Sequence, residues 1–189
     1  MSNIASSVNK HKHTKTCRKY NTVCRFNFPK LPSYTTLITR PLPSGTDPET
    51  KARIGEEHQS VKRLVRTVLA DEKQIQEIYE MFKKEEEGTN YDAAIHGRNC
   101  RIDELLKRAG LEGKEGRERY ERALMYSPAG CQIVPARDLD EFMVNSYNPE
   151  LTRAWNGNTD FQICLDLYAV VGYITDYYAK DDTGLSQES

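Results

Sequence analysis

The sequence predicts an α+β fold in three successive parts: a basic N-terminal arm over residues 1–46, a helical insert over 47–130, and an end part over 131–189. The end part is expected to form part of an antiparallel sheet backed by a tyrosine-bearing helix. Three observations predict this order. The charge is unevenly divided along the chain, apolar residues repeat at helical spacing in the middle, and short alternating runs follow.

The formal net charge of −1 conceals two strongly charged ends. Residues 1–46 carry eight Lys and Arg side chains and no Asp or Glu, whereas residues 138–189 carry ten acidic side chains and two basic ones. The two ends therefore have formal charges of +8 and −8. An arm with this excess of positive charge indicates a polyanionic partner such as nucleic acid.

Four residues of the arm have the side chains that zinc prefers. His11, His13, Cys17 and Cys24 follow the spacing H-x-H-x3-C-x6-C. A short segment with few apolar residues cannot bury enough surface to order itself, and a bound metal ion supplies that stability. We predict a structural zinc site here. The alternative is a disordered basic arm in which the His and Cys residues are incidental.

Basic side chains surround these four residues and are candidate contacts for phosphate groups. They are Lys10, Lys12, Lys15, Arg18, Lys19, Arg25 and Lys30. Tyr20, Phe26 and Phe28 are interleaved with them and could stack on bases. The arm is therefore expected to bind nucleic acid.

Prolines and a capping signal predict where the helical insert begins. Five prolines between residues 29 and 48 predict an extended connector. Thr46 or Asp47 can cap a helix that has Pro48 in its first turn, and the apolar residues from 61 to 69 repeat at helical spacing. The insert is also expected to contain helices over residues 75–82, 103–109 (closed by Gly110) and 117–126.

The end part has the composition of short strands followed by a helix. Strands are expected over residues 131–134, 142–144 and 161–165, with a turn at Asn148-Pro149. Residues 168–180 have the apolar spacing of a helix that would back the sheet.

Tyr173, Tyr177 and Lys180 share one face of that expected helix, because they follow one another at one-turn spacing. Two phenols and an ammonium can form a site that cleaves phosphodiesters. A tyrosine oxygen attacks phosphorus, and the cation stabilises charge on the phosphate oxygens. The alternative is an amphipathic helix whose tyrosines are half-buried against the sheet.

Four ordered blocks resemble the Rep-like replication-initiator region of Helitron transposon proteins. Cys17 followed by residues 24–30 (CRFNFPK) resembles its "TC … CRFNFP" segment, and residues 144–149 (VNSYNP) are similar to its "VNxYNP" block. Residues 158–169 resemble its "N-x-D-x-Q … D-x-Y" block, and residues 173–180 are similar to its "Y-x3-Y-x2-K" end. The blocks lie in the family's order, whereas the helical insert matches poorly.

The resemblance implies part of an HUH-type rolling-circle endonuclease, with an HUH-type antiparallel sheet backed by the tyrosine helix. In that family a metal held by a His pair, Mg²⁺ or Mn²⁺, polarises the scissile phosphate. Tyr173 and Tyr177 are then the nucleophile candidates and Lys180 a helper. The residues of the predicted zinc site fall on a zinc-binding segment of the family. The implied partners are single-stranded DNA, an upstream HUH half and a downstream DNA helicase domain of a longer protein.

Two features of the family are not found in this sequence. The family's His pair lies upstream of the segment that Cys17 begins, on a buried strand with an apolar middle residue, so His11-Lys12-His13 is no substitute. His58 and His96 stand alone in the sequence. There is no G-x-x-x-x-G-K-[ST] phosphate loop, so we expect no helicase activity in this chain. The alternatives to a nicking enzyme are a non-catalytic zinc-stabilised nucleic-acid-binding module and an inactive transposon relic.

Hydropathy excludes two further classes of protein. No run approaches the ~20 apolar residues of a membrane-spanning helix, and the N-terminus lacks an apolar signal region. The five Cys residues are an odd number and favour a reducing compartment over a disulfide framework. We therefore expect no membrane partner and no secretion, and a nuclear or cytoplasmic location.

Overall fold

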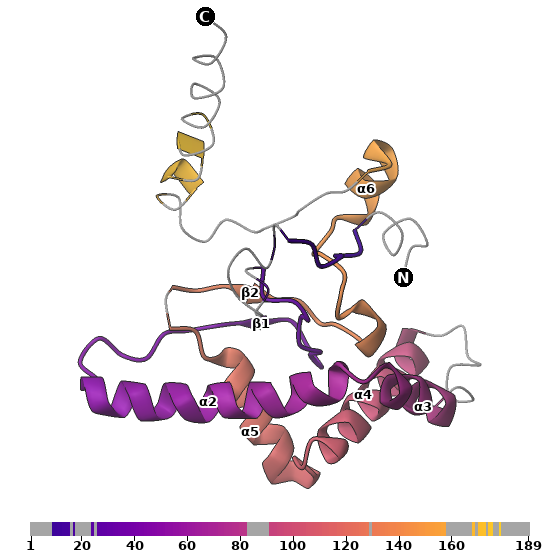
Figure 1. Cartoon of the computed structure of the whole chain (residues 1–189), viewed down its shortest axis with the longest axis horizontal. Coiled ribbons are helices and arrows are strands. Elements are labelled where there is room, and N and C mark those ends of the chain that lie inside the picture. The colour runs from indigo at the N-terminus through magenta and orange to yellow at the C-terminus, as the bar shows by residue number, and fades with distance from the viewer. Residues whose placement is uncertain are drawn as a thin grey trace, which may run out of the picture.

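The computed structural model describes residues 9–15, 17, 24, 26–82, 91–128, 130–157, 168, 170–172, 174–175 and 178. This part of the chain is mostly helical, with one small two-stranded antiparallel sheet (Figure 1). Its strands are β1 (Leu37–Ile38) and β2 (Ile133–Val134), in which Leu37 pairs with Val134 and Ile38 with Ile133. The predicted mixture of helices and an antiparallel sheet is therefore present, although helices dominate.

Helix α2 (Pro48–Leu69) begins where the capping signal predicts. The Asp47 carboxylate accepts a hydrogen bond from the Thr50 amide at 2.8 Å, and Pro48 occupies the first turn. The helix buries Val61, Val65, Val68 and Leu69 against the other helices. Each fully buried side chain of this kind stabilises the fold by roughly 1.5–3 kcal/mol relative to exposure.

Helix α3 (Glu72–Phe82) is found as predicted, whereas α4 (Tyr91–Arg108) begins twelve residues before the predicted start at residue 103. The reason is that α4 buries apolar side chains mainly near its end, at Ile102, Leu105 and Leu106. Its first turns therefore carry no apolar stripe from which a helical period could be recognised. Gly110 follows with φ of +75°, the left-handed conformation that ends helices, as predicted.

Helix α5 (Gly113–Met125) packs across α2 and is joined to the proline-rich connector by a buried hydrogen bond. Tyr120 is fully buried, and its hydroxyl donates to the Pro32 carbonyl at 2.7 Å. The connector is therefore part of the packed fold, because Leu31 and Tyr34 also lie in the core.

The strand predicted over residues 142–144 is wrong. Val144 forms only an isolated antiparallel bridge with Lys10, and Phe142 and Met143 lie in a turn after the short 3-10 helix η2 (Leu139–Glu141). A capping box stabilises η2: its N-cap Asp138 accepts from the backbone, while the Glu141 side chain accepts from the Asp138 amide. This local hydrogen bonding outweighs the strand propensity of the apolar residues.

The turn predicted at Asn148-Pro149 is the start of helix α6 (Pro149–Trp155). The Asn148 side chain accepts hydrogen bonds from the amides of Glu150 and Leu151, and proline is favourable in a first turn. The same two residue types are typical of turns and of helix starts. The dipeptide alone did not distinguish them.

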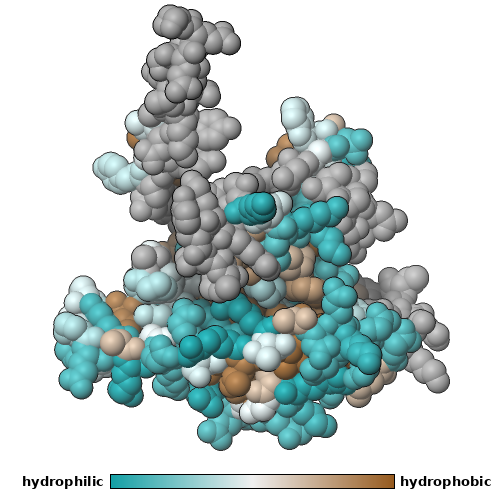
Figure 2. Space-filling view, viewed as in Figure 1, coloured by the Kyte–Doolittle hydropathy of each residue, from teal (hydrophilic) through white to brown (hydrophobic). Residues whose placement is uncertain are grey.

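One core cluster contains residues from all three predicted parts of the chain. Leu31 and Tyr34 come from the arm and connector, Leu139 comes from the end part, and the remainder come from helices α2 to α5 and the turn after α4. A second, small cluster contains Cys17, Cys24 and Phe28, with Met143 packed against it. Figure 2 shows a mainly hydrophilic face over the helices, with small hydrophobic areas.

Several sequence predictions fall outside the described residues. These are the strand over 161–165, the tyrosines Tyr173 and Tyr177, and Lys180. The described positions between residues 168 and 178 are helical, as predicted for that segment. Among the described residues, no helix is long and apolar enough to cross a membrane.

Candidate metal centre

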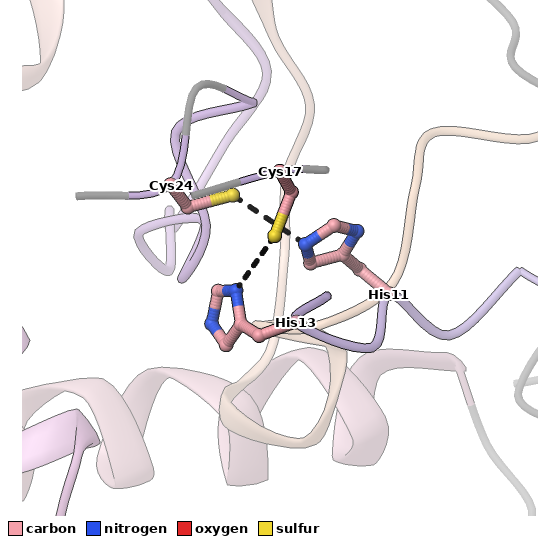
Figure 3. Close-up of side chains that lie close together, drawn as sticks. All are labelled: His11, His13, Cys17 and Cys24. Atoms are coloured by element: carbon pink, nitrogen blue, oxygen red, sulfur yellow. Dashed lines mark hydrogen bonds between the residues drawn. The ribbon is translucent and has the colours of Figure 1, made fainter. Parts of the chain in front are cut away.

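The structure brings together the side chains of the predicted metal site. The ligand atoms of His11, His13, Cys17 and Cys24 all lie within 4.8 Å of one another (Figure 3). Cys17 Sγ is 3.5 Å from His13 Nδ1, and Cys24 Sγ is 3.4 Å from His11 Nε2. In a tetrahedral zinc shell with ordinary bond lengths, sulfur and nitrogen ligands are about 3.5 Å apart. The group could therefore hold a metal ion such as zinc.

The two thiols of the group are buried. Cys17 and Cys24 are only 2% and 3% exposed, whereas His11 is half-buried and His13 is exposed. Thiolates are the form that binds metals, and a buried thiolate requires a compensating cation. Cys17 Sγ donates to the Thr14 carbonyl at 3.3 Å and accepts from the Thr14 amide at 3.2 Å, and the second contact would stabilise a thiolate when a metal ion replaces the proton. The donor set and its surroundings suit a borderline-soft cation.

Aromatic rings hold His11 in place. Its imidazole stacks on Phe28, with ring centroids 4.2 Å apart and planes 6° from parallel, and meets the edge of Phe26 at 5.7 Å. Burial lowers the pKa of His11, and the neighbouring His13 and Lys30 lower it further. At neutral pH the ring is therefore in the neutral form that metal binding requires.

The residues on each side of the site are fixed to a distant segment of the chain. The His11 amide donates to the Met143 carbonyl at 2.6 Å, and the Lys30 amide donates to the Phe142 carbonyl at 2.7 Å. The buried Arg137 holds this segment in turn, because its guanidinium donates to the carbonyls of Glu141 and Val144. The site therefore lies in the part of the arm that is bonded to the residues after η2. Figure 1 shows the indigo and orange segments side by side.

A tight turn places two aromatic side chains on opposite sides. The Asn27 amide donates to the Cys24 carbonyl at 3.0 Å, and Asn27 has φ of +57°, which asparagine tolerates well. Phe28 consequently points into the small core beside the site and is 6% exposed, whereas Phe26 is 47% exposed. Phe26 therefore presents its ring to solvent next to the candidate metal site.

The basic residues of the arm are only partly described. Lys10, Lys12 and Lys15 are exposed around the site, and Lys30 donates from Nζ to the Phe26 carbonyl at 2.8 Å. Lys30 also lies over the Phe28 ring, 4.8 Å from its centroid. The remaining candidates Arg18, Lys19 and Arg25 lie outside the described residues, as do Tyr173, Tyr177 and Lys180.

Two histidines that stand alone in the sequence have neighbours in the fold. His96 Nε2 lies 3.6 Å from Cys100 Sγ one turn along α4, and the His58 ring lies 5.0 Å from that of Tyr126. Among the described residues, neither histidine belongs to a group of three or more metal-binding side chains. Met143 packs against the small core at the candidate metal site. The sequence did not predict this contact, because an apolar residue can have many possible neighbours in a fold.

Comparison with known proteins adds no family to these observations. No family model matches the chain, and no match is found among curated proteins or among solved structures. The functional argument therefore depends on the chain's own residues and geometry.

Proposed function

We propose that this chain is a zinc-stabilised, nucleic-acid-binding part of a Helitron-like rolling-circle replication initiator. The observation that carries the proposal is the convergence of His11, His13, Cys17 and Cys24, whose ligand atoms lie within 4.8 Å of one another. A structural zinc ion there would cross-link the arm internally and order the part of it that bonds to Phe142 and Met143.

The surroundings of the site support nucleic acid as the ligand. The exposed Lys10, Lys12 and Lys15 provide positive charge without a nearby excess of acidic residues in the arm. The exposed ring of Phe26 provides a surface on which a base can stack. Cations that track the backbone and an aromatic ring that stacks on bases are the usual components of a single-strand binding surface.

The proposed lineage is supported by how two of its blocks pack. The block over residues 24–30 contacts the residues just before the block over 144–149, since the Lys30 amide donates to the Phe142 carbonyl and Met143 packs against the cluster of Cys17, Cys24 and Phe28. The first block and the residues that lead into the second, more than 100 residues further along the sequence, therefore pack together. The HUH-type sheet, the nuclear location, and partnership with an HUH half and a DNA helicase domain are further parts of the proposal.

Zinc content and DNA affinity of the full chain test the binding proposal. We expect one zinc ion per chain, its loss in a Cys17→Ser/Cys24→Ser variant, and a fall in affinity for labelled single-stranded DNA when zinc is removed. Cys131→Ser is the matched control, because Cys131 is exposed and lies outside the metal group. A chain without zinc, or DNA affinity that is insensitive to zinc, would contradict the proposal.

Nicking by Tyr173 and Tyr177, aided by Lys180, is the catalytic part of the proposal. Labelled single-stranded DNA is incubated with Mg²⁺ or Mn²⁺, the chain and a separate HUH half that carries the His pair. We expect a covalent protein–DNA adduct that the double variant Tyr173→Phe/Tyr177→Phe abolishes and that Tyr178→Phe leaves intact. An adduct unchanged in the double variant, or no adduct under any condition, would exclude this activity and leave the zinc-dependent binding module.

A further inference from the structure

Helix α2 presents a stripe of basic side chains to α5 and to the chain after it. His58, Lys62 and Arg66 are spaced at four residues and therefore share one face of the helix. Lys62 Nζ donates to the Tyr126 carbonyl at 3.2 Å, and the His58 ring lies 5.0 Å from the Tyr126 ring. The stripe therefore contacts Tyr126, directly after α5, and is far from the metal-binding arm in the sequence.

Lys62 and Arg66 have no ion pair with a carboxylate among the described residues. Both side chains are half-buried, one turn apart. Glu57, which lies next to His58 in the sequence and opposes the lowering of that histidine's pKa by burial, is itself paired with Arg119. Two partly buried cations therefore lie side by side with no neutralising charge from the described protein.

This arrangement is costly in the absence of an anion. Burial lowers the pKa of Lys62 to about 8, with a further contribution from the adjacent Arg66. Burial also lowers the pKa of Arg66, although Tyr120 opposes the shift. An anion between the two side chains would offset both the desolvation and the repulsion. The planar guanidinium and the ammonium are the two groups that most often bind phosphate oxygens in proteins.

We propose that Lys62 and Arg66 form a second binding site, for a phosphate group. The expected source is a phosphodiester of bound nucleic acid, and that choice of source rests on the function proposed above. The site would anchor the strand to a rigid helix of the core, whereas the arm would hold it through the zinc-stabilised lysines. A phosphate on a free nucleotide has the same chemistry, and the experiment separates the two sources.

The main test uses the zinc-loaded full chain and labelled single-stranded DNA over a range of salt concentrations. Lys62→Met/Arg66→Met is expected to weaken binding about tenfold at low salt. It should also reduce the slope of log K against log salt by ~0.7 for each phosphate that the protein no longer neutralises. Arg53→Met is the matched control, because Arg53 is an exposed cation on the same helix. Lys62→Arg/Arg66→Lys keeps both charges and should retain most of the affinity even if the methionine variant folds poorly.

A second measurement identifies the source of the phosphate and keeps this site separate from the arm. Inorganic phosphate and a nucleoside monophosphate are compared with chloride at equal ionic strength, by the rise in Tm of the wild type and of the methionine variant. A rise in Tm that occurs in the wild type and not in the methionine variant supports the site. If the methionine variant then binds DNA as tightly as the wild type, the site is assigned to free phosphate compounds. If removing zinc abolishes DNA binding but leaves the phosphate-induced rise in Tm unchanged, the Lys62 and Arg66 site is independent of the arm. If neither DNA affinity nor Tm distinguishes the variants from the wild type, the proposal is overturned.

Discussion

Single buried side chains connect segments of this chain that are far apart in the sequence. Tyr120 is fully buried on α5, and its hydroxyl donates to the equally buried Pro32 carbonyl. Tyr120→Phe would leave that carbonyl without a donor, and we expect a loss of about 1–2 kcal/mol of unfolding free energy in urea titrations. Tyr178→Phe is the control, since that ring is 74% exposed. Equal stability of the two variants would show that the Tyr120 hydrogen bond contributes nothing.

The ionisation of one further residue, Lys62, makes the stability of the fold depend on pH. Burial lowers its pKa to about 8 in the folded chain, from 10.5 in the unfolded chain. Between these values the unfolded state binds more protons than the folded state, so the contribution of Lys62 to stability rises with pH. Below pH 8 Lys62 is protonated in both the folded and the unfolded state, so the cost of partly burying its ammonium is fully present.

We therefore expect the stability of the wild type to increase relative to that of Lys62→Met between pH 8 and 10.5. Urea unfolding of both proteins in phosphate-free buffer measures this difference, and comparison of the pair removes the contributions of the tyrosines. A difference that is constant across this pH range would contradict the lowered pKa of Lys62.

At the scale of elements, an ion pair joins α4 to η2. The Arg101 guanidinium, 3% exposed, donates from Nε to the Asp138 carboxylate at 3.1 Å, and the same carboxylate caps η2 through the Leu139 amide. Arg101→Met would leave Asp138 partly buried without its partner, and we expect a loss of about 3 kcal/mol in chemical denaturation. Arg101→Met/Asp138→Asn should recover part of that loss, because no unpaired charge remains.

The matched control on the same helix is Lys107→Met. The Lys107 ammonium and the Glu112 carboxylate are 3.9 Å apart, and both side chains are largely exposed. Loss of this ion pair should therefore lower the unfolding free energy by less than ~1 kcal/mol. If Arg101→Met cost no more than Lys107→Met, the buried pair would not hold α4 and η2 together.

At the scale of the whole molecule, the metal site and the helical core are separate clusters. The core of α2 to α5 contains none of the four candidate metal-binding residues, and Cys17 and Cys24 instead pack with Phe28 and Met143. We expect a chelator to leave most of the far-UV helical signal intact. It should remove hydrogen-exchange protection at the amides of His11 and Asn145, which bond the arm to the 142–145 segment. Simultaneous loss of helical signal and arm protection would show a single cooperative unit.

Local signals predicted several elements correctly because neighbouring residues determine them. Asp47 with Pro48 marked the start of α2, and Gly110 marked the end of α4, since caps and left-handed residues act over one turn. The His and Cys spacing also predicted four candidate metal-binding residues, and the structure brings all four together. Close spacing along the chain limits how far apart such ligands can lie.

Errors and omissions occurred where competing local interactions or distant contacts decide the outcome. The sequence alone determined the division of charge, the set of candidate metal-binding residues and the approximate positions of the main helices. Only the tertiary structure decided that the arm pairs with Phe142 and Met143, and that Lys62 and Arg66 lie together without a carboxylate partner among the described residues. Pairing and burial depend on which segments pack against each other, and neither hydrophobic period nor residue spacing encodes that choice locally.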